Sequence, residues 1–369
     1  MLNMKEEDIK HELIKFLINN YSKSILKIGS YSFFILVGVL LSLTSFSQDN
    51  FTDDVRGENG IRIAFYNVEN LFDIENDPVK RDDEFTEKGD KHWNERKYRT
   101  KLHQISKVAA SVGGWEALEL FALCELENRR VIEDLLNLTP LKEAGYKIIH
   151  FESPDRRGID VGFIYLPEKI QLIHSEAIPI VFPWDKKYKT RDILYARLVI
   201  LKADTIDFYV NHWPSRWGGQ LETEDARMHV AKTLLAHRNS LESPKKMIAV
   251  GDFNDAPIDK SMRDVFKAEL DTNLKAEYYN MMYPHLDKQG TNKYQGDWNI
   301  IDQFIVSESL FHSKSGLKIK NKSAIIFNAD YLLEPDPKYE GMQLNRTYLG
   351  MRYKGGYSDH LPIYLDLVR

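Results

Sequence analysis

Residues 247–255 read Met-Ile-Ala-Val-Gly-Asp-Phe-Asn-Asp, a short apolar run that ends in polar side chains. A brief apolar run bounded by glycine predicts a buried strand. Asp252 and Asn254 come where that strand ends, and loops at strand ends form binding and catalytic sites. An Asx turn alone would also explain this pair. A functional role for the pair is therefore supported only if other segments of the sequence are built in the same way.

Four further segments join an apolar strand to polar residues in this manner. They are Asn67-Val68-Glu69-Asn70, Glu125 after the run 118–124, Asn211-His212-Trp213-Pro214-Ser215-Arg216, and Tyr357-Ser358-Asp359-His360. Asp302 joins them from an apolar strand predicted over 300–306. Because polar groups at such ends converge on one edge of a sheet sandwich, we expect one shared site.

The remaining pattern mixes consecutive strands with alternating helices and strands. We predict helices from Asn94 to about Val112, from Asn128 through Leu138, and from Glu222 to about His237. Predicted strands cover 61–67, 118–124, 146–151, 159–165, 170–179, 196–201, 205–211, 247–250, 300–306, 324–327 and 361–367. The fold class is α/β, with two packed sheets and helices outside. The polar stretch 73–92 is predicted to be a surface loop.

Composition excludes several classes of protein. With 43% hydrophobic and 28% charged residues among 369, the chain is neither disordered nor of low complexity. Its single cysteine, Cys124, excludes an intramolecular disulfide scaffold and a cysteine-rich zinc module. The net charge of −5 provides no global basic field for nucleic acid.

The first 48 residues differ from the rest. An apolar run from Phe33 to Leu43 follows Lys23 and Lys27, and small residues precede Gln48. This order is typical of a signal peptide, and the run is short for a membrane span. We therefore expect residues 1–48 to be a signal peptide, with an uncleaved membrane anchor as the alternative. Residues 49–369 would form one exported domain, periplasmic or secreted.

The donor chemistry at the strand ends indicates a hard cation. Carboxylate and amide oxygens without thiols favour Mg²⁺, with Mn²⁺ as an alternative. Two histidines can exchange protons near neutral pH. The sequence has no glycine-rich phosphate loop and no Gly-x-Ser-x-Gly motif. Activated water is therefore the expected nucleophile, and a phosphorus ester is the expected electrophile.

Taken in order, the motifs resemble the endonuclease/exonuclease/phosphatase superfamily, which includes DNase I. The resemblance runs from about Ile61 to the C-terminus and rests on Asn-x-Glu-Asn, Cys-Glu-x-Glu-Asn, Asn-His-Trp-Pro-Ser-Arg, Gly-Asp-Phe-Asn, Ile-Asp-Gln and Ser-Asp-His. It implies a four-layered α/β sandwich and metal-assisted phosphoester hydrolysis. The body is most similar to the bacterial secreted or periplasmic branch.

The same resemblance implies a role for each motif residue. The implied metal ligands are Glu125, Glu69 and Asp359; the implied catalytic residues are His212, Asp252, Asn254, Asp302 and His360; and the implied substrate contacts are Asn67 and Arg216. In this scheme Asp252 activates water, and Asp302 orients His360. Asp160 is a further candidate, as a partner that holds His212.

Several residues keep a structural alternative. Arg216 and Arg227 would bind phosphate or be surface charges. Trp213 and Trp217 would stack on a base or pack at the rim of the site. Lys186, Lys187, Lys189 and Arg191 would form a basic patch or a solvated hairpin.

The substrate class stays open among three alternatives. A nuclease-type phosphodiesterase acting on DNA or RNA is the leading prediction. A phosphatase or phosphodiesterase for small or lipid phosphates is the alternative with the same chemistry, and a non-catalytic binding module is the alternative of another class. The sequence implies no protein partner. We expect the protein to contact a membrane only if the N-terminal leader is not cleaved.

Overall fold

The computed structural model describes Thr52 and residues 55–369. The predicted leader at residues 1–48 lies outside these described residues, so its cleavage or anchoring stays a prediction. Within the described part of the chain, no helix is both long and apolar enough to cross a membrane.

The first of two large sheets has the strand order β14-β20-β1-β2-β4-β3, and β15 also pairs with β20. Its strands are β1 (Gly60–Leu71), β2 (Leu120–Leu126), β3 (Lys147–His150), β4 (Asp160–Tyr165), β14 (Lys318–Ile319), β15 (Ile325–Ile326) and β20 (Ile363–Val368). The sheet is mixed, since β1 runs parallel to β2 and antiparallel to β20.

The second sheet has the order β5-β6-β7-β8-β13-β10-β9. Its strands are β5 (Ile170–Ile178), β6 (Ile193–Ile200), β7 (Asp204–His212), β8 (Lys246–Asp252), β9 (Ala268–Glu269), β10 (Tyr278–Asn280) and β13 (Asp302–Ser307). It too is mixed, because β8 is parallel to β7 and antiparallel to β13.

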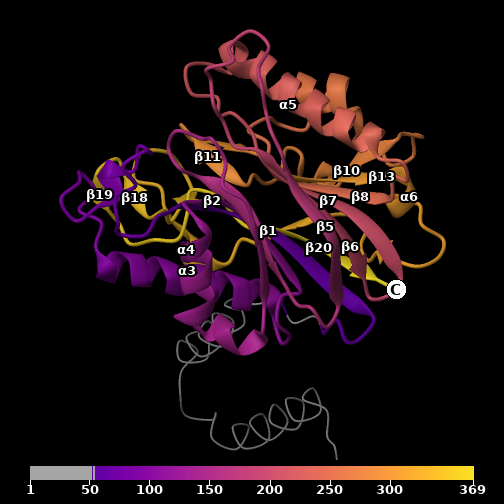
Figure 1. The fold of residues 1–369 in the computed structure, drawn as a ribbon, viewed down its shortest axis with the longest axis horizontal. Coiled ribbons are helices and arrows are strands. Elements are labelled where there is room, and N and C mark those ends of the chain that lie inside the picture. The colour runs from indigo at the N-terminus through magenta and orange to yellow at the C-terminus, as the bar shows by residue number, and fades with distance from the viewer. Residues whose placement is uncertain (1–51, 53–54) are drawn as a thin grey trace, which may run out of the picture. The chain divides into compact units, whose positions relative to one another are not determined.

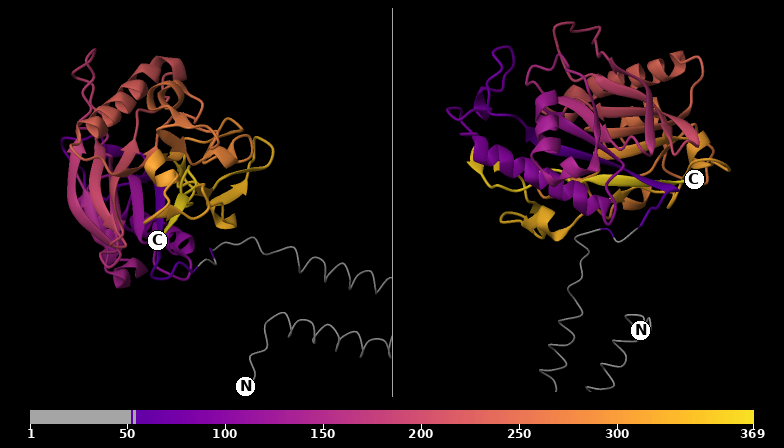
Figure 2. Two further views of the ribbon diagram at one scale, coloured as in Figure 1. Left: turned by 90° about the vertical axis from the view of Figure 1, so that its right-hand side faces the viewer. Right: turned by 60° about the horizontal axis from the view of Figure 1, so that its bottom comes forward.

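Helices cover the outer faces of the two sheets (Figures 1 and 2). These covering helices are α3 (Glu95–Gly113), α4 (Arg129–Asn137) and α5 (Gln220–Ser240), and a single turn, α6 (Glu308–Phe311), packs into the main core. Leu102 and Ile105 of α3 pack into the core of the first sheet, and Leu234 of α5 packs with Tyr209 of the second. The result is the predicted fold class, two packed mixed sheets with helices outside.

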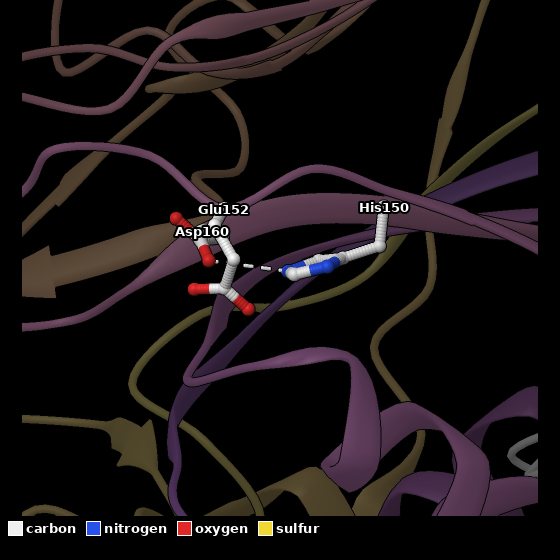
Figure 3. Close-up of side chains that lie close together, drawn as sticks. All are labelled: His150, Glu152 and Asp160. Carbon is white, nitrogen blue, oxygen red and sulfur yellow. Dashed lines mark hydrogen bonds and ion pairs between the residues drawn. The ribbon is translucent and has the colours of Figure 1, made fainter. Parts of the chain in front are cut away.

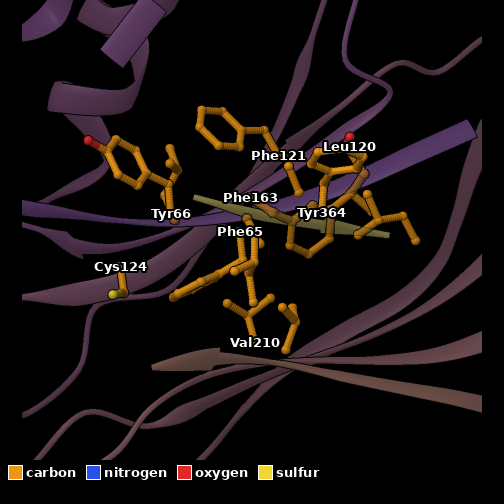
Figure 4. Packing of buried hydrophobic residues seen from close by; sticks show 14 of the residues in the cluster. Phe65, Tyr66, Leu120, Phe121, Cys124, Phe163, Val210 and Tyr364 are labelled. Carbon is orange, nitrogen blue, oxygen red and sulfur yellow. The ribbon is translucent and has the colours of Figure 1, made fainter. Parts of the chain in front are cut away.

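The main core lies between the sheets. Phe163 of the first sheet meets Phe208 of the second edge to face, with ring centroids 5.5 Å apart, and Figure 4 shows Phe65 and Val210 in the same layer. These side chains are fully buried. Burial of one such side chain contributes roughly 1.5–3 kcal/mol, so the two sheets are held as one unit.

Three small hairpins and several short helical turns lie outside the two large sheets. The hairpins are β11 (Asn292–Tyr294) with β12 (Asp297–Asn299), β16 (Leu333–Pro335) with β17 (Met342–Leu344), and β18 (Tyr348–Leu349) with β19 (Arg352–Tyr353). The turns are Asp83–Phe85, Pro140–Ala144, Ser261–Phe266, Tyr283–His285 and Asp330–Leu332. Sequence patterns did not predict the hairpins, because each strand in them is only two or three residues long.

Candidate active site

Glu125 reaches the site through a break in strand pairing. Strands β1 and β2 pair in register as far as Asn67 and Cys124, and the register shifts before Leu71 and Leu126. Glu125 has a φ of 63°, in the left-handed region. A non-glycine residue held there costs roughly 1–2 kcal/mol, and such conformations cluster at functional sites. The Asn70 N–H donates to Glu125 Oε2 over 2.9 Å and fixes the carboxylate.

Asn67 connects the two sheets at this edge. Its Nδ2 donates to Asp252 Oδ2 over 3.1 Å and lies 3.4 Å from Glu125 Oε1. Its Oδ1 accepts from the Glu69 N–H over 3.0 Å. Asn67 is 1% exposed, so the turn at the end of β1 is fixed together with the carboxylates. The amide is therefore positioned as a structured donor rather than as a free turn residue.

The ends of β7, β8 and β13 align at this edge. His212 pairs with Asp252 in parallel register, and Asp302 pairs with Asp252 in antiparallel register. His212 Nε2 lies 3.7 Å from Asp252 Oδ2 and 3.9 Å from Glu125 Oε1. The Asn254 N–H donates to Asp252 Oδ1 over 2.9 Å, and its side-chain amide donates to the Trp213 carbonyl. Backbone register thus brings together residues that are far apart in sequence.

His360 is held by Asp302, as the sequence predicts. His360 Nδ1 lies 2.7 Å from Asp302 Oδ2, and its Nε2 lies 3.8 Å from Asp252 Oδ2. The Thr291 hydroxyl accepts from the Asp302 N–H. The ring therefore has a fixed orientation and turns its second nitrogen toward the carboxylates.

Burial and neighbouring charge give the three central titratable groups different pKa values. Burial, with added repulsion from Asp302 and Glu125, raises the pKa of Asp252 to about 7, although His360 opposes this. Burial disfavours charge on His360, but the nearby carboxylates of Asp302, Asp252 and Asp359 together outweigh it, and the His360 pKa lies well above its usual range. Burial, followed by repulsion from Arg191, moves the His212 pKa well below its usual range. At neutral pH the site therefore pairs a charged imidazole with a neutral one.

The donor set fits a divalent cation. Glu125, Asp252 and Asp302 converge, and within the described chain their ion-pair partners are histidines only. Asp302 Oδ1 is buried and has no hydrogen-bond partner among the described residues. Ligand atoms of Asp252, Asp302 and His360 all lie within 4.8 Å of one another, and the two carboxylates are the oxygen donors in this group. Excess negative charge and oxygen donors are the environment that a hard cation requires.

Glu69 and Asp359 are joined by Arg346, a residue that the sequence analysis missed. Arg346 Nε donates to Glu69 Oε1 over 2.8 Å, and another guanidinium nitrogen donates to Asp359 Oδ2 over 2.9 Å. Glu69 Oε2 accepts from the Thr347 N–H. Both Glu69 oxygens are thus occupied by donors, and its ligand role stays a prediction. No local pattern marks Arg346, because its partner Glu69 lies 277 residues away in sequence.

Arg216 lies beside the cluster rather than in it. Its guanidinium donates to the Asn254 carbonyl and to Asp259 Oδ2, each over 2.7 Å. Arg227 is fully buried against Asp255, which favours the structural alternative for that residue. Trp213 is 1% exposed and Trp217 is 89% exposed, so of these two residues Trp217 is the one available to stack on a ligand.

Two secondary expectations are wrong. Asp160 does not hold His212, because its carboxylate accepts from the Ser153 N–H and lies 3.1 Å from His150 Nε2. His212 Nδ1 has no partner among the described residues. Arg191 is not part of a surface patch, since it is 5% exposed. Its guanidinium donates inward to the carbonyls of His212 and Trp213 and braces the end of β7.

Two packed mixed sheets with this His–Asp and carboxylate cluster define a DNase I-like phosphoric ester hydrolase. Residues 62–369 match the Endonuclease/Exonuclease/phosphatase family. The chain belongs to that family, whose members are generally dependent on divalent metals. A search of curated proteins finds no matching sequence.

Solved structures share the fold at low sequence identity. Humanized TDP2 of D. rerio is 15% identical, with a TM-score of 0.52, covering 84% of this chain and 99% of that one. An endonuclease/exonuclease/phosphatase family protein from Bacteroides thetaiotaomicron is 15% identical, with a TM-score of 0.51, covering 84% and 97%. A mannosyl-6-phosphatase from the same organism is 14% identical, with a TM-score of 0.50, covering 84% and 100%. At such identity these likenesses concern the fold alone.

Proposed function

We propose that this protein is a Mg²⁺-dependent, nuclease-type phosphodiesterase that uses activated water as its nucleophile. The observation that carries the proposal is the convergence at one sheet edge, through the contacts of 2.7–3.9 Å given above, of Asn67, Glu125, His212, Asp252, Asp302 and His360. This set combines oxygen ligands, a base and a charged imidazole, which is what hydrolysis of a phosphorus ester needs.

Each residue has a specific task in the proposed reaction. Glu125 would hold Mg²⁺, with Asp359 and Glu69 as further ligands. When bound, Mg²⁺ neutralises phosphate oxygens and stabilises the charge that develops in the transition state.

The proton chemistry is assigned to the chain's own groups. Asp252 accepts a proton from the attacking water, because its pKa of about 7 makes it an effective base near neutral pH. His360 stays charged beside Asp302 and stabilises negative charge on the phosphate. His212 stays neutral and can hydrogen-bond the phosphate or the leaving group. Asn67 and Asn254 orient Asp252 and contact the phosphate.

A nucleotide-bearing substrate is favoured by the rim of the site. Trp217 is nearly fully exposed, and it adjoins Arg216, whose guanidinium contacts the Asn254 loop. Stacking on an aromatic ring contributes roughly 1–3 kcal/mol per base. A short or single-stranded nucleic acid is therefore the proposed substrate class.

Small phosphate esters form the second candidate class. The inward position of Arg191 leaves only lysines in the proposed basic patch, and the net charge is −5. This favours small substrates over long duplex DNA, whose affinity comes mainly from phosphate contacts. A fold shared with a mannosyl-6-phosphatase is compatible with this alternative.

A substrate panel distinguishes the two classes. Purified protein with Mg²⁺ would be given plasmid DNA, RNA, a chromogenic phosphodiester, inositol phosphates and sugar phosphates. We expect hydrolysis of the phosphodiesters, with loss of activity in Glu125→Gln. Hydrolysis of monoesters alone would establish the second class. Absence of hydrolysis with both Mg²⁺ and Mn²⁺ would leave a non-catalytic module and overturn the proposal.

A further inference from the structure

A second cluster of metal-ligating side chains lies between β3 and β4, apart from the residues assigned above. His150 ends β3, Asp160 begins β4, and Glu152 lies in the connecting loop. Their ligand atoms all lie within 4.8 Å of one another. Figure 3 shows the three side chains pointing toward a common centre.

The spacing fits coordination of a small divalent ion. His150 Nε2 and Asp160 Oδ2 are 3.1 Å apart. Ligands about 2.1 Å from a tetrahedral Zn²⁺ are separated by about 3.4 Å. This pair therefore fits one edge of a tetrahedron, and Glu152 can supply a third corner.

An ion pair with His150 does not balance the charge of this cluster. Glu152 and Asp160 bring two carboxyl groups together beside one imidazole. His150 can neutralise only one of the two carboxylates. The Lys80 ammonium lines the same cavity as Glu152, and its hydrogen bonds go to the carbonyls of Ser153 and Asp155. Two facing carboxylates need a shared proton or a cation between them.

The cluster is both rigid and accessible. The Ser153 N–H donates to Asp160 Oδ1, and Lys80 ties down the loop, so the ligands are preorganised. His150 and Asp160 have side chains that are only 2% and 1% exposed. Glu152 lines a cavity of about 320 Å³ that also contacts Glu127, Asn128 and Gly158. An ion could enter from this cavity, and a water molecule in it could complete the coordination.

We propose that His150, Glu152 and Asp160 form a second divalent-metal site, suited to a transition-metal ion such as Zn²⁺ or Mn²⁺. One imidazole and two carboxylates suit these ions better than the oxygen-only preference of Mg²⁺ and Ca²⁺. The site is separate from the hydrolytic cluster and does not depend on the proposed reaction.

Occupation of this site would stiffen a connection to His212. The loop that contains Asp155 meets Arg191, whose NH1 donates to Asp155 Oδ2 over 3.3 Å. Arg191 in turn donates to the His212 carbonyl. A cation that fixes the β3–β4 loop thus supports the end of β7, so the role of the ion is structural.

Metal stoichiometry after chelation tests the proposal. Chelated full-length protein would be titrated with ZnCl₂ by calorimetry, and bound zinc would be counted by mass spectrometry. Glu125→Gln serves as the background, because it weakens the proposed catalytic site. In that background we expect one zinc ion to remain, and further replacement of Glu152 by Gln should weaken its binding at least about tenfold.

Matched variants make the outcome decisive. Glu87→Gln alters an exposed carboxylate elsewhere and should leave zinc binding unchanged. Zinc should also raise the melting temperature of Glu125→Gln, and Glu152→Gln should reduce that rise. Equal affinity and stoichiometry with and without Glu152 would overturn the proposal. The absence of any bound zinc in Glu125→Gln would also overturn the proposal, and would indicate that Glu152 and Asp160 share a proton instead.

Discussion

At the scale of single residues, His360 and Asp302 form a buried pair that turns one imidazole nitrogen toward Asp252. Removal of either partner removes both the fixed orientation of the His360 imidazole and the support for its positive charge. We expect His360→Ala to lower kcat by roughly 10²–10⁴-fold and Asp302→Asn to lose much of the same activity.

The two losses should not multiply, because the residues act as one unit. A double variant should be about as impaired as His360→Ala alone, as measured by steady-state kinetics. Circular dichroism of each variant controls for unfolding. A loss in the double variant equal to the product of the single losses would show independent action.

Asp192 provides a pH test away from the active site. Burial raises its pKa to about 6, opposed by the Ile180 N–H and assisted by Asp160. A carboxyl whose folded-state pKa is raised stabilises the fold only when protonated. That contribution is present below the unfolded pKa of about 3.9 and is lost as pH rises through about 6.

Asp192→Asn should therefore be more stable than the native protein at pH 8, by about 1 kcal/mol after allowance for solvent screening. At pH 4 the two proteins should unfold at similar denaturant concentrations. Urea unfolding at both pH values measures this difference. A variant that is less stable at pH 8 would contradict the assigned direction of the pKa shift.

At the scale of elements, α3 begins where the sequence predicts. Asn94 precedes it with extended backbone, and its side chain accepts from the Lys97 N–H over 3.1 Å. Asn94→Ala should cost about 1 kcal/mol in unfolding free energy, and Asn94→Asp should cost little, because Asp also caps helices. Chemical denaturation compares the two, and equal losses would argue against a capping role.

The close approach of β7 and β8 needs Gly251. A Cβ at this position would lie 2.1 Å from the Asn211 carbonyl oxygen. Gly251→Ala should therefore force the strands apart and destabilise the fold by roughly 1–3 kcal/mol. It should also lower activity, since β8 ends at Asp252. Gly145→Ala, in open space but with a φ of 71°, is the control for backbone strain alone. A milder effect at Gly251 than at Gly145 would contradict this account.

At the scale of the whole molecule, the sequence predicted most features that depend on residues close together in the chain, such as strands and helix starts. Apolar runs located the main strands, and Asn94 and Asn128 marked helix starts. The order of polar strand ends identified the residues that meet at the site. Arg346 could not be found this way, because its ion pair with Glu69 joins the segment after β17 to β1, far away in sequence. Asp160 was misassigned because sequence order does not reveal which histidine faces it.

The predicted leader is also a whole-molecule property. We propose that the protein is exported, because residues 33–43 form an apolar run followed by small residues. N-terminal sequencing of native protein should begin near Gln48. An intact Met1 in a membrane fraction would favour the anchor, whereas an intact Met1 in soluble cytoplasm would exclude export.

The most direct test of the central claim is hydrolysis of a chromogenic phosphodiester as Mg²⁺ is varied. EDTA should abolish the reaction, and Mg²⁺ or Mn²⁺ should restore it in the native protein. Glu125→Gln keeps the size of the side chain but removes the charge that a cation needs. It should therefore need much more Mg²⁺ and turn over far more slowly. Native-like activity of Glu125→Gln at limiting Mg²⁺, or full activity in EDTA, would contradict the account.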